Sequence, residues 1–404
     1  MRSFTQSFMI ATGLLALLAA PALAGGFSIR EQSAEGLGAA FAGVAAGTDG
    51  LSAMFWNPAT ISQHNGQGYV SENNLSVILP YSKADNGLPL GNSGNIGKDA
   101  IVPASYSVYG LNDQITLGLG INAPFGLATD SDPWLGSPRG DLSKITSINV
   151  SPTIAYQPMD WITFAVGLQG EYLKAKLTAQ SPAGGPDFFD AKADDFAAGF
   201  TAGILLQPAD NLDIGIGFRS SISHNLKGDG FLTPAGRNGS LEAPLDTPEM
   251  VTVGVKYRPD EQWTLMGGAE WSNWSRLKSL DITFDGPPPL TLSIPENWKD
   301  SWFFSAGAEY ALNDALTLRG GVAYEISPVT DGARTPRLPD NDRYWLSAGA
   351  GYKFNDWFTA NIGYSHIFMK DGDINLPAAG PTPALVASFK QHIDLVAVSA
   401  VIDW

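Results

Sequence analysis

Short turns and long connections alternate strictly along most of this chain, and this alternation constrains the fold more than any other feature. From residue 69 onward, apolar residues recur at every second position, as in the stretch from Tyr344 to Phe354, which is the period of a β-strand with one apolar face. Six tight turns rich in Asn, Asp or Pro lie at 111–114, 157–160, 207–210, 258–261, 312–314 and 354–356. Seven longer stretches rich in Gly, Pro and Asp lie near 80–100, 123–142, 178–192, 228–245, 285–298, 328–340 and 371–389. These thirteen connections predict fourteen strands, with both ends of the sheet on the side of the short turns.

An even number of strands joined by short turns at one end and long loops at the other is typical of outer-membrane β-barrels. The alternation itself is ambiguous, because a soluble β-sandwich has the same pattern with its faces exchanged. Composition leaves both open, since a chain with only 16 % charged residues, against about 25 % on average, suits either a large β-sandwich or a membrane β-barrel, and the alternation of connection lengths favours the barrel. After residue 25, no apolar run reaches the ~20 residues of a membrane-spanning helix. The last strand ends on an aromatic residue, Trp404. We therefore predict an all-β, 14-stranded antiparallel transmembrane β-barrel.

The first 24 residues have the organisation of a secretory signal peptide. Arg2 precedes an apolar core from Phe8 to Ala20, and small residues at Ala22 and Ala24 match a signal-peptidase site. A membrane anchor is the alternative interpretation, but the core is shorter than a spanning helix and leads into the cleavage site. We expect cleavage after Ala24 and export to the outer membrane of a Gram-negative bacterium.

Residues 25–65 differ from the rest of the chain and predict a compact N-terminal segment outside the sheet. Small and polar residues favour short helical turns, and Pro58 ends any preceding helix because proline disfavours helical geometry in the residue before it. A segment of this size can plug the lumen of a barrel. The predicted organisation is a signal peptide at 1–24, an N-terminal hatch at 25–65 and the transmembrane barrel at 66–404.

The sequence contains no recognisable centre for catalysis, metal binding or cofactor binding. It has no cysteine, and its four histidines, His64, His224, His366 and His392, are not in metal-ligand spacing. Neither a Gly-x-Ser-x-Gly elbow nor a phosphate-binding loop occurs. The formal net charge of −16 argues against a nucleic-acid partner, which requires a basic face. We predict no enzyme activity, no metal and no cofactor.

The predicted inward faces of the strands bear on the kind of channel. A general porin needs a charged, water-filled lumen, whereas the inward positions here are rich in Gly, Ser, Thr, Gln and Ala. Together with a plug, this composition favours a gated path. A general porin remains an alternative, as does a surface-exposed structural barrel that acts as an adhesin or phage receptor.

Short motifs in a specific order resemble the FadL/TodX family (OmpP1-like) of outer-membrane transporters. In the N-terminal segment they are Gly26-Phe27-Ser28-Ile29, Gly36-Leu37-Gly38, Ala42-Gly43 and Asn57-Pro58-Ala59. Farther along they are Gly126 to Thr129, Thr247 to Met250, Trp271 to Ser275, Asn297 to Asp300, Gly321 to Val329, and Leu338 to Gly349. Each motif is weak alone, but their order and spacing extend over nearly all of the chain after the signal peptide.

The resemblance implies a fourteen-stranded barrel with a hatch, in agreement with the strand count. It also implies passive uptake of long-chain fatty acids or similar hydrophobic molecules, including aromatic hydrocarbons. The ligand first enters an apolar groove between external loops and then a tighter pocket beside the start of the hatch. A shift of the hatch releases it sideways into the membrane, through a gap where the third strand kinks. Lipopolysaccharide blocks direct partitioning into the outer membrane, whereas apolar sites take up the ligand by hydrophobic transfer.

The resemblance also assigns roles to individual residues. It places Phe27 in the lining of the inner pocket. The hatch motif is Asn57, Pro58 and Ala59, and the kink is expected at Pro124, Phe125 and Gly126, because proline cannot donate to a β-ladder. For the carboxylate of a fatty acid the resemblance favours Lys278, followed by Lys174 or Lys176. For each lysine, an ordinary interface or loop charge is the alternative.

Overall fold

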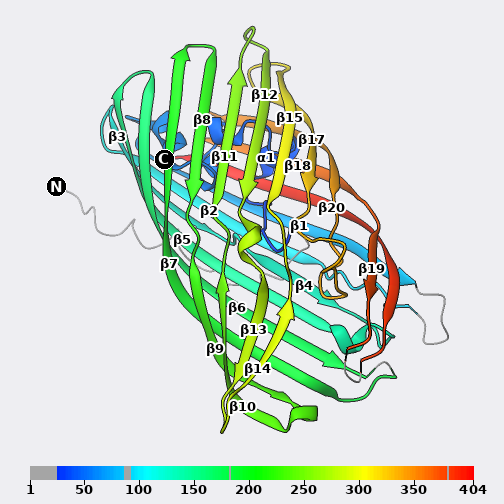
Figure 1. Cartoon of the computed structure of the whole chain (residues 1–404). Helices are drawn as coiled ribbons and strands as arrows, with labels where there is room; N and C mark the ends of the chain where they lie inside the picture. Colours follow the sequence, from blue (N-terminus) through cyan, green and yellow to red (C-terminus); the bar gives the residue numbers. More distant parts are fainter. Residues whose placement is uncertain (1–24, 86–91, 182, 380–381) are drawn as a thin grey trace.

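The computed structural model describes residues 25–85, 92–181, 183–379 and 382–404, and the predicted signal peptide lies outside these residues. In this part of the chain, twenty hydrogen-bonded segments form one sheet. They make fourteen wall strands, because eight wall strands are continuous and six are each interrupted once. Every neighbouring pair is antiparallel, and β1 pairs with β20 from Val70↔Asp403 to Asp85↔Ser388, which closes the barrel. The predicted 14-stranded barrel is confirmed (Figure 1).

The continuous wall strands are β1 (Tyr69–Asp85), β2 (Ala100–Gly110), β5 (Leu142–Met159), β6 (Ile162–Gln180), β7 (Asp187–Ala209), β16 (Leu316–Ile326), β17 (Arg343–Asn355) and β20 (Leu385–Asp403). The interrupted ones are β3 (Ile115–Asn122) with β4 (Gly126–Asp130), β8 (Leu212–Arg219) with β9 (Ser223–Leu232), and β10 (Arg237–Asp246) with β11 (Met250–Tyr257). The other three are β12 (Trp263–Ser272) with β13 (Ser279–Phe284), β14 (Leu290–Pro295) with β15 (Ser301–Ala311), and β18 (Phe358–Met369) with β19 (Gly372–Leu376). Short 3-10 turns η4 (Ser137–Arg139) and η5 (Thr233–Ala235) lie in the connections, and η6 (Trp274–Arg276) lies in the break between β12 and β13.

The outward face of the wall is apolar, which distinguishes a membrane barrel from a soluble sandwich. Large apolar side chains such as Leu346 (55 % exposed) and Val322 (54 %) point away from the lumen, and such a continuous exposed apolar surface requires a lipid environment. Trp161, Trp263 and Trp357 are exposed beside the short turns, where the aromatic belt of a membrane protein lies. None of the helices in the described ranges is long and apolar enough to cross a membrane.

Residues 34–64 form four short helical elements inside the barrel, drawn in blue in Figure 1. They are α1 (Ala34–Gly38), η1 (Val44–Ala46), η2 (Ser52–Phe55) and η3 (Pro58–His64). Side chains cap two of them, since Ser33 Oγ accepts from Gly36 N and Asn57 Oδ1 accepts from Ala59 N. The predicted boundary between residues 65 and 66 falls in the link between η3 and β1.

Glycines on the lumen face let the backbone of this segment lie directly against the wall. A Cβ at Gly215 would overlap the carbonyl oxygen of Ala45, and one at Gly217 would overlap that of Trp56. Both glycines are on β8. The inward glycines predicted from the sequence therefore leave room for a packed segment, and in this half of the lumen they do not line an open channel.

Candidate functional site

Four aromatic rings from distant parts of the chain form a buried cage in the lumen. Phe27 lies at its centre, with ring centroids 4.5 Å from Trp274, 5.9 Å from Phe125 and 5.9 Å from Trp298. All four side chains are at most 4 % exposed. Phe27 comes from the start of the N-terminal segment, and each of the other three comes from a break in a wall strand. The interruptions thus turn aromatic residues inward at one level of the barrel.

The predicted kink residues lie at the break between β3 and β4. Pro124 and Phe125 are within the break, and Gly126 is the first residue of β4. Asn122 pairs with Asn149 and Gly126 pairs with Thr146, so three residues of the broken strand face two of β5. This is the arrangement of a β-bulge. Ser147 partly replaces the ladder, since its Oγ accepts from Phe125 N (2.9 Å) and donates to Phe125 O (2.8 Å).

The same break leaves a gap in the strand pairing of the wall. Within the described residues, β3 pairs with the 105–110 part of β2, and β4 pairs with β5 on its other side. The 100–104 part of β2 therefore has no ladder partner toward β4. At the extracellular end a single bridge, Gly97↔Thr129, limits the gap.

The N-terminal segment supplies the hydrogen bonds that the gap lacks. Ile29 N donates to Pro124 O (2.8 Å), and Gly126 N donates to Phe27 O (2.8 Å). Gln32 adds a side-chain contact, because its Nε2 donates to Ala123 O (2.7 Å). Sequence reasoning did not single out Gln32, since a glutamine in a polar segment carries no local signal of a partner 91 residues away.

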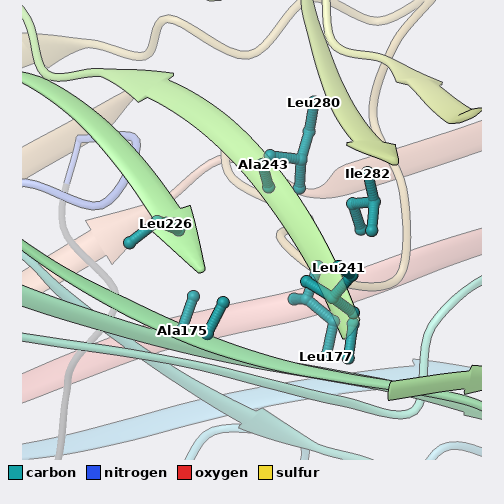
Figure 2. A pocket seen from close by; sticks show the side chains of 9 residues that line it. Ala175, Leu177, Leu226, Leu241, Ala243, Leu280 and Ile282 are labelled. Atoms are coloured by element: carbon teal, nitrogen blue, oxygen red, sulfur yellow. The ribbon is translucent and has the colours of Figure 1, made fainter. Parts of the chain in front are cut away.

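An apolar groove lies on the extracellular side of the cage (Figure 2). It is partly open to solvent and is lined by side chains from β6, β7, β9, β10 and β13. Its lining is Ala175, Leu177, Ala191, Ala193, Leu226, Leu241, Ala243, Leu280 and Ile282, all of them apolar. Apolar concave sites of this kind take up hydrophobic ligands. Groove and cage belong to one continuous cluster of packed apolar side chains.

The lysines predicted from the sequence lie outside this cluster. Lys174 and Lys176 alternate along β6 with the buried Leu173 and Leu177 and thus lie on the outer face of the wall. Lys176 Nζ is 3.5 Å from Asp190. Lys278 is exposed and directly follows Leu277, which is buried in the cluster. The structure brings neither Lys174 nor Lys176 to the cage, because two residues of opposite parity on a strand face opposite sides.

A different cation, Arg337, lies at the extracellular end of the groove. It is 9 % exposed, and its guanidinium carbon lies 5.9 Å from the ring centroid of Phe189. Its Nη1 donates to Leu142 O and Ser143 Oγ (3.2 and 3.1 Å), and its Nη2 donates to Thr178 O (2.9 Å). Nε has no acceptor among the described residues, and no carboxylate lies within 4.0 Å. A guanidinium has five N–H donors, so two remain available.

Charge around Arg337 is set by burial and by Glu296. Burial lowers the pKa of Arg337 to about 10, against the opposing effects of Glu296 and Asp141. The guanidinium therefore stays charged at neutral pH. Burial raises the pKa of Glu296 to about 7, although Trp298 Nε1 donates to its carboxylate (2.9 Å). Glu296 thus accepts a hydrogen bond from Trp298 of the cage and acts on Arg337 through its charge. Its pKa of about 7 means that this charge changes near neutral pH.

The periplasmic half of the lumen, nearer the short turns, contains a different kind of site. It is a charged network between the N-terminal segment and the wall. Arg319 Nη2 is 2.8 Å from Asp49 and 3.8 Å from Glu35, and its Nε is 2.9 Å from Glu309. Lys256 also approaches Glu309, at 3.8 Å. The three carboxylates lie close enough together to hold a metal ion, but the guanidinium of Arg319 already occupies the position of the cation.

The hatch motif residues attach another part of the N-terminal segment to the wall. Asn57 Nδ2 donates to Ala45 O (2.7 Å) within the segment and to Ile204 O (3.0 Å) on β7. Pro58 begins η3, and Ala59 is fully buried. The motif therefore fixes a turn of the segment and attaches it to the wall.

Comparison with known proteins gives a consistent result along the chain. The sequence pattern of the family described as "Outer membrane protein transport protein (OMPP1/FadL/TodX)" matches residues 15–403. The chain is similar to the long-chain fatty acid transport protein of Escherichia coli (strain K12), with 28 % identity over 429 residues that cover 92 % of this chain and 94 % of the relative.

Two solved structures share the fold. A FadL homologue of Pseudomonas aeruginosa superposes with a TM-score of 0.85 at 23 % identity, over 94 % of this chain and 100 % of that one. The toluene transporter TbuX of Ralstonia pickettii superposes with a TM-score of 0.65 at 19 % identity, over 90 % and 98 %.

Proposed function

The chain belongs to the OMPP1/FadL/TodX family of outer membrane transport proteins, and from this premise we propose that it takes up long-chain fatty acids or similar hydrophobic molecules passively. It is a β-barrel of the Gram-negative outer membrane and not an enzyme. The observation that carries the proposal is the continuous apolar cluster from the groove, through the cage, to the gap beside β4. A hydrophobic ligand can follow this route without meeting bulk water.

Entry begins at the groove. Transfer of an alkyl chain or aromatic ring from water to this apolar surface is favourable in proportion to the area buried. The lining lies on the inner face of strands at the long-loop end of the barrel (Figure 1), so the wall separates a ligand held there from the surrounding lipopolysaccharide.

Passage through the cage is coupled to the hatch by Phe27. The cage is filled by the ring of Phe27, so an entering ligand displaces it. Displacement breaks the bonds from Ile29 N to Pro124 O and from Gly126 N to Phe27 O, which hold the hatch across the gap. The ligand then leaves sideways, between β2 and the kink at 124–126, into the lipid.

A fatty acid also carries a carboxylate, whose burial is unfavourable unless it is paired. Arg337 supports this requirement, because it is a buried cation with two unused N–H donors beside the groove. Lys278, exposed next to the buried Leu277, is the alternative partner for the carboxylate. Uncharged hydrocarbons use the same route without this contact.

Uptake of labelled oleate by a strain lacking the gene, complemented with variants, tests the proposal. Ala243→Trp fills the groove from inside, whereas Glu242→Trp places the same side chain on the outward face of the same strand. We expect Ala243→Trp to abolish most uptake and Glu242→Trp to leave it unchanged. Uptake equal to wild type with Ala243→Trp would exclude the groove as the entry site.

Planar-bilayer conductance separates this function from that of a general porin. The wild-type protein is expected to show no steady, large, ion-permeable openings. Such openings would instead support a porin. A complemented strain that gains phage sensitivity but takes up no oleate would support the structural or receptor alternative.

A further inference from the structure

Three lysines lie side by side on the outer face of the wall. Lys144 on β5 is directly opposite Lys176 on β6, which is directly opposite Lys192 on β7. Side chains at directly opposed positions have Cβ atoms about 4.5–5.5 Å apart, and like charges there are destabilising. A row of three therefore calls for an anion close to it.

The row points away from the lumen. Along β6 and β7 the positions on both sides of Lys176 and Lys192, namely Ala175, Leu177, Ala191 and Ala193, line the inner groove. Side chains alternate between the two faces of a strand. Lys144 and Lys192 are exposed, and Lys176 is 42 % exposed.

The protein neutralises the row only in part, because Asp229 on β9 is directly opposite Lys192 at one end of it. Of the three lysines, Lys176 alone has a carboxylate within 4.0 Å among the described residues, Asp190 at 3.5 Å. The next row toward the periplasm is different, since Lys174, Asp194, Lys227 and Glu242 alternate in sign from strand to strand. Three lysines at adjacent positions of neighbouring strands stand out in a chain of net charge −16.

The depth of the row in the membrane identifies what faces it. Four residues closer to the periplasm on each of β5, β6 and β7, the outward side chains are Ile148, Tyr172 and Phe196, which are 47 %, 36 % and 68 % exposed. These belong to the lipid-facing band. Four residues of strand are about 13 Å, and somewhat less along the membrane normal because barrel strands are tilted. The lysines thus lie at the level of the outer-leaflet headgroups.

We propose that Lys144, Lys176 and Lys192 bind the phosphate groups of an outer-leaflet glycolipid, the lipid A portion of lipopolysaccharide. The acyl chains then lie against Ile148, Tyr172 and Phe196, and the phosphates meet the ammonium groups above them. Because the same strands carry the groove on their inner face, the bound lipid also steadies the hairpin of β6 and β7.

Binding of lipid A to the purified protein in detergent tests this site. The probes are bisphosphorylated lipid A, the same lipid without phosphates, and inorganic phosphate. We expect Lys144→Gln/Lys176→Gln/Lys192→Gln to weaken binding of bisphosphorylated lipid A by about 10-fold or more, since charge-assisted hydrogen bonds are lost. The triple Lys→Arg variant should bind normally, because it keeps the charges.

Lys353→Gln is the matched control. Lys353 is also exposed on the wall, but next to a short turn at the opposite rim, so its loss should leave binding unchanged. Equal binding of phosphorylated and dephosphorylated lipid, or of the triple Gln variant and the wild type, would overturn the proposal. Full competition by inorganic phosphate would show a free-anion site and would overturn it as well. If the triple variant fails to fold, as judged by heat-modifiable migration, Lys192→Gln is tested instead and should show a smaller loss.

Discussion

The two halves of the lumen differ in how closely the N-terminal segment packs against the wall. In the periplasmic half, the backbone of the hatch lies against glycines of β8, and the network around Arg319 joins the hatch to the wall. In the extracellular half, apolar side chains of the groove and cage predominate, and buried ion pairs of Arg343 with Asp340 and of Arg30 with Glu270 lie beside the cage. The wall strands whose glycines contact the backbone of the hatch are uninterrupted at that level. The strand breaks that form the cage lie on the extracellular side of it.

This difference suggests that the two halves respond differently to an entering ligand. Close backbone packing and buried ion pairs resist displacement, because a separated buried charge is left without compensation. Aromatic and aliphatic contacts are non-directional, so a hydrophobic ligand can replace them at little cost. If the proposed function holds, we therefore expect the periplasmic half to stay closed while the extracellular half exchanges its contacts for those of a ligand.

Deleting residues 25–65 should have the largest effect on the difference between the two halves. The ladders of the wall close without the hatch, and a closed barrel satisfies its backbone hydrogen bonds internally. We expect a folded barrel that changes from closed to permeable for small polar solutes, measured by antibiotic sensitivity and bilayer conductance. Unchanged permeability would mean that the segment does not plug the lumen.

Arg319→Ala should destabilise the protein by about 3–5 kcal/mol, the usual effect of removing one partner of a buried ion pair. Arg319 is 2 % exposed and serves three carboxylates. The control is Arg258→Ala at the periplasmic rim, where the guanidinium is 38 % exposed and pairs with Asp213, so that the loss should be about 0.2–1 kcal/mol. Urea unfolding in detergent measures the free energy of unfolding of both variants. Similar losses would contradict a special role of the network around Arg319.

Arg337→Gln should weaken binding of oleate by about 10- to 150-fold, equivalent to the 1.5–3 kcal/mol of a charge-assisted hydrogen bond. Binding of an uncharged alkane of similar length should hardly change. Lys278→Ala is measured beside it. A loss confined to oleate in the Lys278 variant would identify that lysine as the partner of the carboxylate, and equal losses for both ligands would indicate a packing effect.

The smallest expected effect concerns pH. The pKa of Glu296 is raised to about 7 by burial, so this carboxyl is mainly protonated at pH 6 and ionised at pH 8. When ionised it attracts Arg337 and repels a ligand carboxylate, so anion binding is coupled to proton uptake. Oleate affinity should therefore fall a few-fold from pH 6 to pH 8. Glu296→Gln should remove this dependence, and an unchanged pH profile in that variant would exclude Glu296 as its source.

The sequence by itself determined the repetitive part of this protein. Period-two alternation and the alternating connection lengths predicted the fourteen strands and the closed barrel. This was possible because strand geometry is local and the type of each turn depends on the few residues within it. The position of Pro124 likewise predicted a break near 124, since a missing N–H cannot join a ladder.

Tertiary structure decided everything that joins distant segments. It placed Lys174 and Lys176 on the outer face. Period-two alternation in the sequence separates the two faces of a strand, but it does not show which face a single lysine belongs to when that face points to the lumen or to the lipid headgroups. It also brought Gln32 to Ala123, Glu35 to Arg319, and Arg337 to the end of the groove. These contacts join residues up to 284 positions apart. They depend on the closure of the barrel around the hatch, which leaves no local trace in the chain.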